Sequence, residues 1–294
     1  MTSELSILIP VFNAECYGLV EDLRRQCNAV ESLSFEIIVL DDCSDNFEAT
    51  ANERINSLPG CRFARNDCNL GRAGNRNKLA SMAHFKWLLF IDGDMTIDSQ
   101  DFILRYLGVA SGLRIVYGGY KIGGMHPDNL RWCYEKKYLR SLHKMEKERF
   151  QVYNQFRTCN FLINREVFSQ LKFDTSLKLY GYEDTCFARK AHALGYEIRL
   201  TDNPVVFADF EPNHAFLAKT EAALRNLKML EADLAGSSLL LNAVRFLHLL
   251  RLTAVFRRFY RSRRAGWRKT LVESKPNLRI FYLYKLGYYL DFPT

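Results

Sequence analysis

Polar clusters follow three predicted strands, at the point where each strand ends, and two of these clusters contain carboxylates. The strands cover Leu5–Pro10, Phe35–Leu40 and Lys86–Ile91, and the clusters after them read Pro10-Val11-Phe12-Asn13, Asp41-Asp42-Cys43-Ser44 and Asp92-Gly93-Asp94. Because parallel strands present their carboxyl ends at one edge of a sheet, we expect these clusters to meet there. Carboxylates gathered at one edge repel one another unless a cation or a ligand lies between them. The pattern predicts a ligand site, with capping of the next helix by Asp41 and Ser44 as the alternative.

Asp92 and Asp94 are the predicted metal ligands. Gly93 between them permits a sharp turn, so that both carboxylates can face one divalent cation. Mg²⁺ and Mn²⁺ prefer such oxygen ligands and commonly hold phosphate as well. Because D-x-D spacing is common by chance, the prediction rests on its place directly after a buried strand.

A glycine-rich basic loop, Asn69–Asn77, leads into a predicted helix over Arg72–His84. Backbone N–H groups at that helix start, together with Arg72 and Arg76, can bind phosphate oxygens. The loop matches neither the P-loop nor G-x-G-x-x-G, which argues against ATP hydrolysis and dinucleotide binding. The alternative is an exposed, capped helix with two solvated arginines.

A second acidic pair, Glu183-Asp184, opens a predicted helix over Glu183–Leu194. A carboxylate at the mouth of a pocket can act as a general base. The alternative is a helix cap, because the N-terminus of a helix stabilises negative charge.

The elements around these motifs predict an α/β fold. Helices expected over Glu15–Ser32 and Asn46–Leu58, and a weak strand over Cys61–Arg65, complete an alternating series typical of a parallel sheet. Beyond about residue 100 the pattern is mixed, with helices at Asp101–Leu107 and Pro127–Phe150 and strands at Ile115–Gly119, Thr158–Ile163, Tyr196–Leu200 and Val205–Phe207. Only helical patterns follow, over Asn213–Leu234, Ser237–Tyr260 and Leu278–Leu290. We therefore expect a mixed α/β catalytic domain over residues 1–212 and a helical extension over residues 213–294.

The composition is that of a globular protein, with 48% hydrophobic and 25% charged residues among 294, which excludes wholesale disorder and fibrous architectures. Nine of the 41 Lys and Arg residues lie between Arg245 and Lys269, where there is no Asp or Glu. The net charge of +8 therefore belongs to one segment, which argues against a nucleic-acid-binding domain. The absence of C-x-x-C pairs, of a signal peptide and of an apolar run of about 18 residues predicts a cytoplasmic protein with reduced thiols.

The basic segment is predicted to be an amphipathic helix over Ser237–Tyr260. Arginines flank an apolar side formed by Leu240, Val244, Leu247, Leu250, Ala254 and Phe256. Such a helix suits an anionic membrane surface, which predicts a peripheral protein at the inner face of the membrane. The alternatives are packing of this apolar side on the catalytic domain, and a homodimer built from the aromatic stretch Leu278–Leu290.

Five motifs in this order and spacing resemble those of the family 2 glycosyltransferases. They read SILIPVFNAE, IIVLDDCSD, NLGRAGNRN, WLLFIDGDM and GYEDTCFARKAHALGYEI, within about residues 5–210. The resemblance implies the GT-A fold, with a Rossmann-like nucleotide-binding half and a mixed central sheet. It also implies a metal-dependent, inverting transfer of a sugar from a nucleoside diphosphate sugar, above all a UDP-sugar. The acceptor it implies is a glycan or a lipid-linked glycan in polysaccharide synthesis.

The resemblance also implies residue roles. The donor nucleotide would be bound by Pro10, Val11, Phe12, Asp42, Arg72, Arg76 and Asp92. A carboxylate in the base pocket accepts the imino N–H of uracil, thymine or guanine, which disfavours CMP donors. Asp94, together with Asp92, would hold Mn²⁺ or Mg²⁺, and Arg76 would contact the diphosphate. Asp184 would be the general base, with Glu183 as its neighbour.

Two positions depart from the family pattern. Many relatives have a metal-binding His after the last core strand, where this chain has Phe207. Asp209 or His214 could replace it, although His214 also fits a solvent-facing or helix-capping residue. Asn75 stands where the family loop has a small Ala.

Other functions stay open at this stage. A nucleotidyltransferase would carry a glycine-rich basic loop directly after its first strand, where this chain has Pro10-Val11-Phe12-Asn13. A non-catalytic binding module with a decayed site is disfavoured by the intact Asp42, Asp94 and Asp184. Nucleic-acid binding through the arginine-rich tail would depend strongly on salt.

Overall fold

The computed structural model describes residues 3–45, 50–110, 112–145, 151–176, 180–234, 238–273 and 275–292. The chain divides into two compact units. The first unit comprises Met1–Gly123, Glu146–Lys178 and Glu183–Asp209, and the second comprises Gly124–Met145, Leu179–Tyr182 and Phe210–Thr294. The second unit therefore takes in a segment that the sequence pattern assigned to the catalytic domain.

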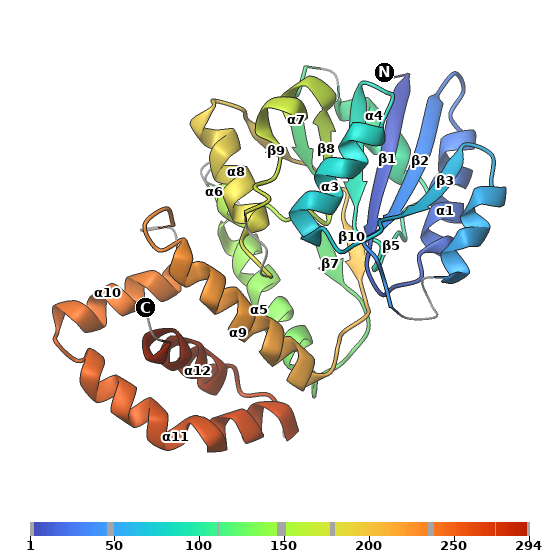
Figure 1. The fold of residues 1–294 in the computed structure, drawn as a ribbon. Coiled ribbons are helices and arrows are strands. Elements are labelled where there is room, and N and C mark those ends of the chain that lie inside the picture. The colour runs from blue at the N-terminus through green and yellow to red at the C-terminus, as the bar shows by residue number, and fades with distance from the viewer. Residues whose placement is uncertain are drawn as a thin grey trace. The chain divides into compact units, whose positions relative to one another are not determined.

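A seven-stranded mixed sheet forms the centre of the first unit, in the order β3-β2-β1-β4-β8-β6-β9 (Figure 1). Its strands are β1 (Glu4–Val11), β2 (Ser34–Asp41), β3 (Cys61–Arg65), β4 (Trp87–Ile91), β6 (Ile115–Tyr117), β8 (Asn160–Asn164) and β9 (Ile198–Leu200). The first four strands are parallel to one another, whereas β8 runs antiparallel to both β4 and β6. The predicted mixed central sheet is confirmed.

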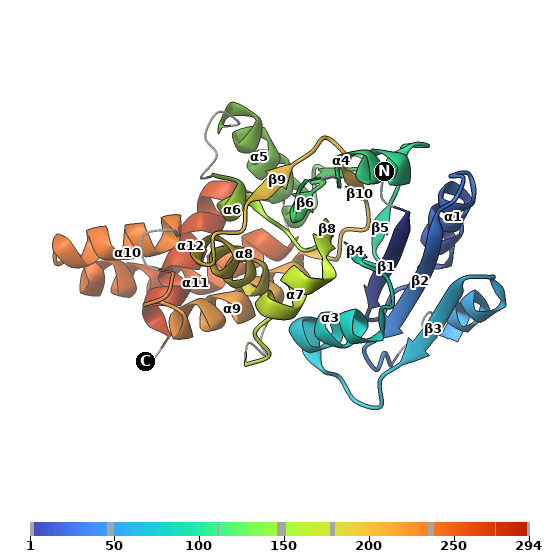
Figure 2. The same cartoon turned by 90° about the horizontal axis from the view of Figure 1, so that it is seen from above.

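Helices cover both faces of this sheet. They are α1 (Tyr17–Asn28), the 3₁₀ helix η1 (Asn52–Ser57), α3 (Gly71–Met82), α4 (Phe102–Val109), α6 (Gln151–Gln155), α7 (Arg165–Leu171) and α8 (Glu183–Ala193). Seen from above, α1 and α4 lie on one face and α3 and α7 on the other (Figure 2). Both faces of the central strands are buried, so these strands read as continuous apolar runs.

Phenylalanines fill the core between the sheet and the helices α7 and α8. The rings of Phe90 and Phe161 stack at 4.8 Å between centroids, and those of Phe173 and Phe187 at 4.5 Å. Helix α7, which the apolar pattern did not predict, starts where the Asn164 side chain accepts a hydrogen bond from the Glu166 N–H at 2.9 Å. This contact is a typical N-cap.

A small second sheet, in the order β5-β10-β7, belongs to the same unit. It consists of β5 (Met95–Thr96), β7 (Tyr120–Ile122) and β10 (Val205–Phe207). Strand β10 was predicted at these bounds, whereas β5 and β7 are too short to produce a recognisable pattern. Residues 46–49 of the predicted helix Asn46–Leu58 lie outside the described residues, and the rest of it contains η1.

The second unit is helical and contains α5 (Leu130–Met145), α9 (Asn213–Met229), α10 (Leu239–Leu249), α11 (Thr253–Glu273) and α12 (Leu278–Asp291). Helix α5 joins this unit because it packs on α9 and α12. The Leu130 N–H donates to Asn213 Oδ1 at 2.7 Å, and the rings of Tyr134 and Phe281 lie 5.6 Å apart.

The aromatic stretch in α12 packs inside the second unit. Phe281, Tyr284 and Tyr289 are fully or almost fully buried. A Cβ added at Gly287 would lie 2.1 Å from Cδ2 of Tyr260, so α11 and α12 cross closely at this point. This packing accounts for the aromatic density without a second copy of the chain.

The prediction of a single helix over Ser237–Tyr260 is wrong. The chain turns by 119° between α10 and α11. Arg251 adopts a left-handed φ of 57° and its N–H donates to the His248 carbonyl, while the Leu252 N–H donates to the Leu247 carbonyl at 2.9 Å. This pair of hydrogen bonds is a Schellman motif, which usually has Gly at the left-handed position. The segment has neither Gly nor Pro there, so the sequence pattern did not reveal the break.

Candidate active site

The predicted polar clusters meet at one edge of the seven-stranded sheet. The Asp42 N–H donates to the Val11 carbonyl at 2.8 Å, and the Gly93 N–H donates to the Pro10 carbonyl at 3.2 Å. These backbone bonds connect the chain beyond the ends of β1, β2 and β4. The parallel register of these three strands brings the clusters together, as the strand-end rule requires.

Asp41 stabilises the turn after β2. Its side chain is completely buried, accepts the Ser44 N–H at 3.1 Å and lies 3.2 Å from Nε of Arg65. Ser44 Oγ in turn accepts the Asn13 N–H at 2.8 Å, which connects this turn to the chain after β1. Asp41 and Ser44 therefore form hydrogen bonds within the turn itself. Residues 46–49, where the helix that they were expected to cap would begin, lie outside the described residues.

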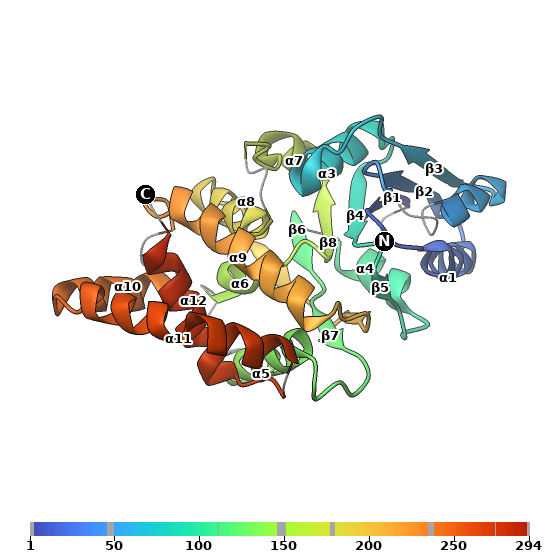
Figure 3. The ribbon, with the colours of Figure 1, turned by 60° about the horizontal axis from the view of Figure 1, so that its bottom comes forward.

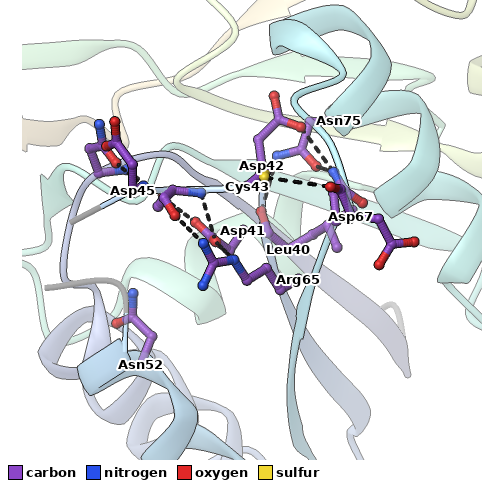
Figure 4. Close-up of polar contacts among 12 residues, drawn as sticks. Leu40, Asp41, Asp42, Cys43, Asp45, Asn52, Arg65, Asp67 and Asn75 are labelled. Carbon is purple, nitrogen blue, oxygen red and sulfur yellow. Dashed lines mark hydrogen bonds and ion pairs between the residues drawn. The ribbon is translucent and has the colours of Figure 1, made fainter. Parts of the chain in front are cut away.

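Asp42 lies on the other side of the same turn, beside Asn75 (Figure 4). Its Oδ1 accepts hydrogen bonds from Asn66 Nδ2 at 2.9 Å and from the Leu70 N–H at 2.8 Å. The carboxylate thus holds the residue that precedes α3. Its Oδ2 receives no hydrogen bond from the part of the chain that the structure describes, which leaves this oxygen for a ligand N–H.

Asn75 and Asn66 form a buried network that the sequence did not reveal. Asn75 Nδ2 donates to the Leu40 carbonyl at 3.0 Å, and its Oδ1 accepts from Asn66 Nδ2 at 3.1 Å. The amide at position 75 therefore ties α3 to the end of β2, where a small residue would leave the Leu40 carbonyl without this donor. Asn66 Oδ1 is buried without a partner among the described residues. The sequence feature that could have identified Asn66 is its position directly after β3, because the other polar clusters of the site also directly follow strands.

The acidic turn after β4 is held by Arg76. Nη2 of Arg76 lies 2.5 Å from Asp92 Oδ1, and the arginine is almost completely buried. Its Nε has no hydrogen-bond partner among the described residues. A buried guanidinium N–H without a partner is suited to an anionic ligand oxygen. Arg76 therefore orients Asp92 and has a donor left for phosphate.

Gly93 is required by the packing of this turn. An added Cβ would lie 2.6 Å from Cγ2 of Val11 and 3.3 Å from the Pro10 carbonyl oxygen. Only a residue without a side chain allows the acidic turn to approach the end of β1 this closely.

Asp92 and Asp94 form an oxygen-only pair suited to a hard cation. Burial raises the pKa of the Cys159 thiol, and the charges of both Asp92 and Asp94 raise it further, so both carboxylates lie near this one residue. Two carboxylates with phosphate and water as further ligands are a common Mg²⁺ environment in proteins. The donor set therefore fits Mn²⁺ or Mg²⁺.

Within the first unit, the described residues add no third ligand to this pair. Phe207, at the position expected for His, is buried opposite Met95, directly after the acidic turn. Asp209 is exposed, and His214 is exposed on α9 in the second unit. Among the described residues no group of three or more His, Cys, Asp or Glu side chains is arranged to hold a metal ion.

The acidic pair at the start of α8 faces two arginines. Glu183 Oε1 lies 3.4 Å from Nη1 of Arg72, and Asp184 Oδ2 lies 3.3 Å from Nη1 of Arg157. Burial raises the pKa of the Asp184 carboxyl, the cation of Arg157 opposes this increase, and the charge of Glu183 adds to it. A carboxylate with a raised pKa is a stronger base than one in water.

Arg157 is the second residue that the sequence did not reveal. It precedes β8, and because β8 runs antiparallel to β4, the start of β8 lies at the edge where β4 ends. The Asp92 N–H donates to the Cys159 carbonyl at 3.1 Å across this point. Only the direction of β8 brings Arg157 to the site.

Cys16, in contrast, is no nucleophile, because burial raises the pKa of its thiol to about 12.

Two curated relatives come from Haemophilus influenzae, and each is described as an uncharacterized glycosyltransferase. One is 39% identical over 92 residues, 31% of this chain and 29% of the relative. The other is 25% identical over 175 residues, 58% of this chain and 65% of the relative. The chain thus spans less than two thirds of either relative.

Solved structures share the fold at low identity. The mannosyltransferase PcManGT from Pyrobaculum calidifontis, in complex with GDP-Man and Mn²⁺, superposes with a TM-score of 0.58 at 16% identity, covering 97% of this chain and 84% of that chain. S. aureus TarS 1–349, in complex with UDP-GlcNAc, has a TM-score of 0.52 at 15% identity, covering 76% of this chain and 66% of that chain. At such identities these similarities concern the fold alone.

The family model for glycosyl transferase family 2 matches residues 6–172. This span is more than half of the chain and contains Asp42, Arg76, Asp92 and Asp94. The matched segment ends before Asp184, which the geometry alone associates with Arg157. With its mixed sheet and the strand-end carboxylates, this chain has the GT-A fold and belongs to glycosyl transferase family 2.

Proposed function

We propose that the chain is a glycosyltransferase that moves a sugar from a nucleoside diphosphate sugar to an acceptor hydroxyl, with inversion at the anomeric carbon. One observation carries the proposal. A buried carboxylate after β2, an acidic pair after β4 and a carboxylate with a raised pKa at the start of α8 belong to the same unit of the fold. Family membership and the GT-A fold support the same reaction class.

Asp42 is the proposed selector of the base. Its Oδ2 can accept the imino N–H that uracil and guanine both present. TarS in complex with UDP-GlcNAc and PcManGT in complex with GDP-Man carry these two bases. We propose UDP as the donor nucleotide, GDP being the other that the same contact fits.

The proposed reaction is a single displacement. Asp184 takes the proton from the acceptor hydroxyl as that oxygen forms a bond to the anomeric carbon. The bond from the anomeric carbon to the diphosphate breaks, and the diphosphate oxygen keeps the electron pair. Arg76 contributes a buried N–H toward the developing negative charge. Asp92 and Asp94 would hold Mn²⁺ or Mg²⁺, which when bound supplies positive charge beside the leaving diphosphate. The proposed acceptor is a glycan or a lipid-linked glycan in polysaccharide synthesis.

Nucleotide binding is the first test. Thermal unfolding is measured with UDP, GDP, dTDP and CMP, each with and without Mn²⁺, for the wild type, Asp94→Asn and the control Asp22→Asn on the exposed side of α1. A ligand at about 100 times its Kd stabilises a protein by about 2.7 kcal/mol, a shift of several degrees. We expect a Mn²⁺-dependent shift with UDP or GDP in the wild type and in Asp22→Asn, and its loss in Asp94→Asn.

Donor hydrolysis separates the enzyme from the alternatives. Release of nucleoside diphosphate from the sugar donor, with water as acceptor, needs no knowledge of the natural acceptor. Nucleotide binding without any turnover of UDP-sugar or GDP-sugar donors would favour the non-catalytic binding module. Failure to bind any of the four nucleotides would overturn the proposal itself.

A further inference from the structure

Helices α10 and α11 of the second unit meet at a corner (Figures 1 and 3). Apolar side chains are exposed on both sides of this corner. Between residues 246 and 259 the largest exposed fractions are those of Leu249, at 80%, and Val255, at 65%. Phe246, Leu252 and Phe259 are also exposed. We name these five residues the corner patch. They come from 14 consecutive positions on the two sides of a 119° bend.

Helix α10 is apolar on two opposite faces. Leu241 and Val244 are buried in the second unit. Leu239, Phe246 and Leu249, at spacings of seven and three residues, lie on the face turned away from that core, and Leu239 is 88% exposed. A surface helix of a globular protein has polar residues on its exposed face. The second apolar face of α10 therefore calls for an apolar environment outside the unit.

The same corner carries a concentrated positive charge. No Asp or Glu occurs between Asp233 and Glu273. Arg261 and Arg268 of α11 pair with Asp291 at 2.6 Å and with Glu221 at 2.5 Å. Six arginines of this segment form no ion pair within the described part of the chain, namely Arg245, Arg251, Arg257, Arg258, Arg263 and Arg264, the last of which lies over the Tyr288 ring. Four of these six are within two residues of the corner patch.

The break between the helices makes the corner a projecting surface rather than a span. No single described helix is long and apolar enough to cross a membrane, and α10 with α11 reaches that length and composition only when counted across the bend. The left-handed Arg251 puts a charge at the bend itself. Charges at this point favour the level of lipid headgroups over the hydrocarbon interior.

We propose that the α10–α11 corner docks on an anionic lipid bilayer, with the corner patch among the acyl chains and the unpaired arginines at the headgroups. The charge complementarity and the apolar side chains together select this partner. A second copy of the chain would bring the same cations against one another. The phosphates of a nucleic acid could pair with the arginines, but a nucleic acid would provide no apolar environment for Leu249 and Val255.

Vesicle co-sedimentation tests this proposal on the full chain. Vesicles of phosphatidylcholine alone are compared with vesicles containing about one third phosphatidylglycerol, in low and in raised salt. We expect binding to the anionic vesicles, little binding to the neutral ones, and weakening in salt. The readout is binding rather than sugar transfer, so its result is independent of the proposed function.

Two double variants separate charge from apolar insertion. Arg257→Gln with Arg258→Gln should weaken partitioning about 30-fold, the effect of two cations at an anionic surface. Phe246→Ser with Leu249→Ser should weaken it at least about 10-fold through lost apolar burial. The matched controls Arg62→Gln with Arg199→Gln, and Leu194→Ser with Met229→Ser, change exposed residues elsewhere and should bind like the wild type.

Three outcomes would overturn the proposal. The first is absence of binding to anionic vesicles by the wild type. The second is equal loss in the variants and in their matched controls, which would indicate a net-charge or solubility effect. The third is a concentration-dependent dimer in sedimentation velocity that Phe246→Ser with Leu249→Ser abolishes while vesicle binding persists. That result would assign the patch to a second copy of the chain.

Discussion

Nη1 of Arg157 lies 3.3 Å from Oδ2 of Asp184. The two residues are far apart in the sequence, since Arg157 precedes β8 and Asp184 lies in the first turn of α8. Burial raises the pKa of Asp184, and the positive charge of Arg157 lowers it, which makes the increase smaller. The ion pair also fixes the orientation of the carboxylate. Arg157 is therefore a positioning residue for the proposed base, and it sets the pH at which the base becomes ionised.

Arg157→Gln should move the acidic limb of the kcat/KM profile to higher pH. The base acts when ionised, and removal of the neighbouring cation favours its protonated form. The variant should therefore lose activity at acidic pH and approach the wild type well above the pKa of Asp184. The control is Arg165→Gln, an exposed arginine at the start of α7. An unshifted limb in Arg157→Gln would mean that Arg157 does not act on the base.

Asp184→Asn should abolish transfer and leave donor binding intact. A general base typically contributes a factor of about 10²–10⁴ to the rate. The rate of transfer, or of donor hydrolysis, is compared with Mn²⁺-dependent nucleotide binding for the same variant. Retention of more than about one hundredth of the rate would show that another residue takes the proton.

Gly93→Ala should displace the acidic turn. The added Cβ would lie 2.6 Å from Val11 Cγ2, so the turn or β1 must shift. We expect donor affinity in Mn²⁺ to fall at least about 10-fold, because metal ligands must be held within a fraction of an ångström. Gly18→Ala is the matched control, since a Cβ at Gly18 meets nothing within 4 Å. Equal nucleotide titrations for the two variants would contradict the assignment of this turn.

Asn75→Ala should destabilise the protein, although Ala is the residue that the family pattern has there. It removes the hydrogen bond from Asn75 Nδ2 to the Leu40 carbonyl and the one that Asn75 Oδ1 accepts from Asn66 Nδ2, although Asn66 Nδ2 still donates to Asp42 Oδ1. Loss of one intramolecular hydrogen bond costs about 0.5–1.5 kcal/mol, which urea unfolding can measure. Asn242→Ala, at an exposed position of α10, should have little effect. A neutral Asn75→Ala would show that the network repacks around the smaller side chain.

Lys285→Met should stabilise the protein near pH 7. Burial lowers the pKa of Lys285 to about 8, and the charge of Glu135 only partly opposes this. A lysine whose folded-state pKa lies below its unfolded value costs stability while it is protonated. Wild-type stability should therefore rise from about pH 8 toward the unfolded pKa of about 10.4. Lys285→Met should have a higher Tm at pH 7 than the wild type, and its stability should not rise between about pH 8 and pH 10. The control Lys86→Met should keep the wild-type Tm at pH 7 and the wild-type rise. A lower Tm for Lys285→Met would mean that the ring contacts of the ammonium with Tyr134 and Phe281 outweigh its burial.

The strand-end carboxylates were predictable because their placement depends on local pattern and one general rule. Apolar runs mark β1, β2 and β4, and parallel strands end at the same edge. Asp42 and the Asp92–Asp94 turn therefore meet in any sheet that pairs these strands. The α/β fold class and the strand β10 follow from the same local signals.

The tertiary structure alone decided which other residues join the site and where the last helices bend. Arg157 reaches Asp184 because β8 runs antiparallel to β4, and strand direction depends on how the chain crosses between elements rather than on the residues of the strand. Asn66 and Asn75 meet across nine residues because β3 and α3 return to the end of β2. The bend after α10 arises at an arginine in a left-handed conformation. Helical propensity favours continuation there. The break is stabilised by the two hydrogen bonds of the Schellman motif and by the packing of both helices on α12.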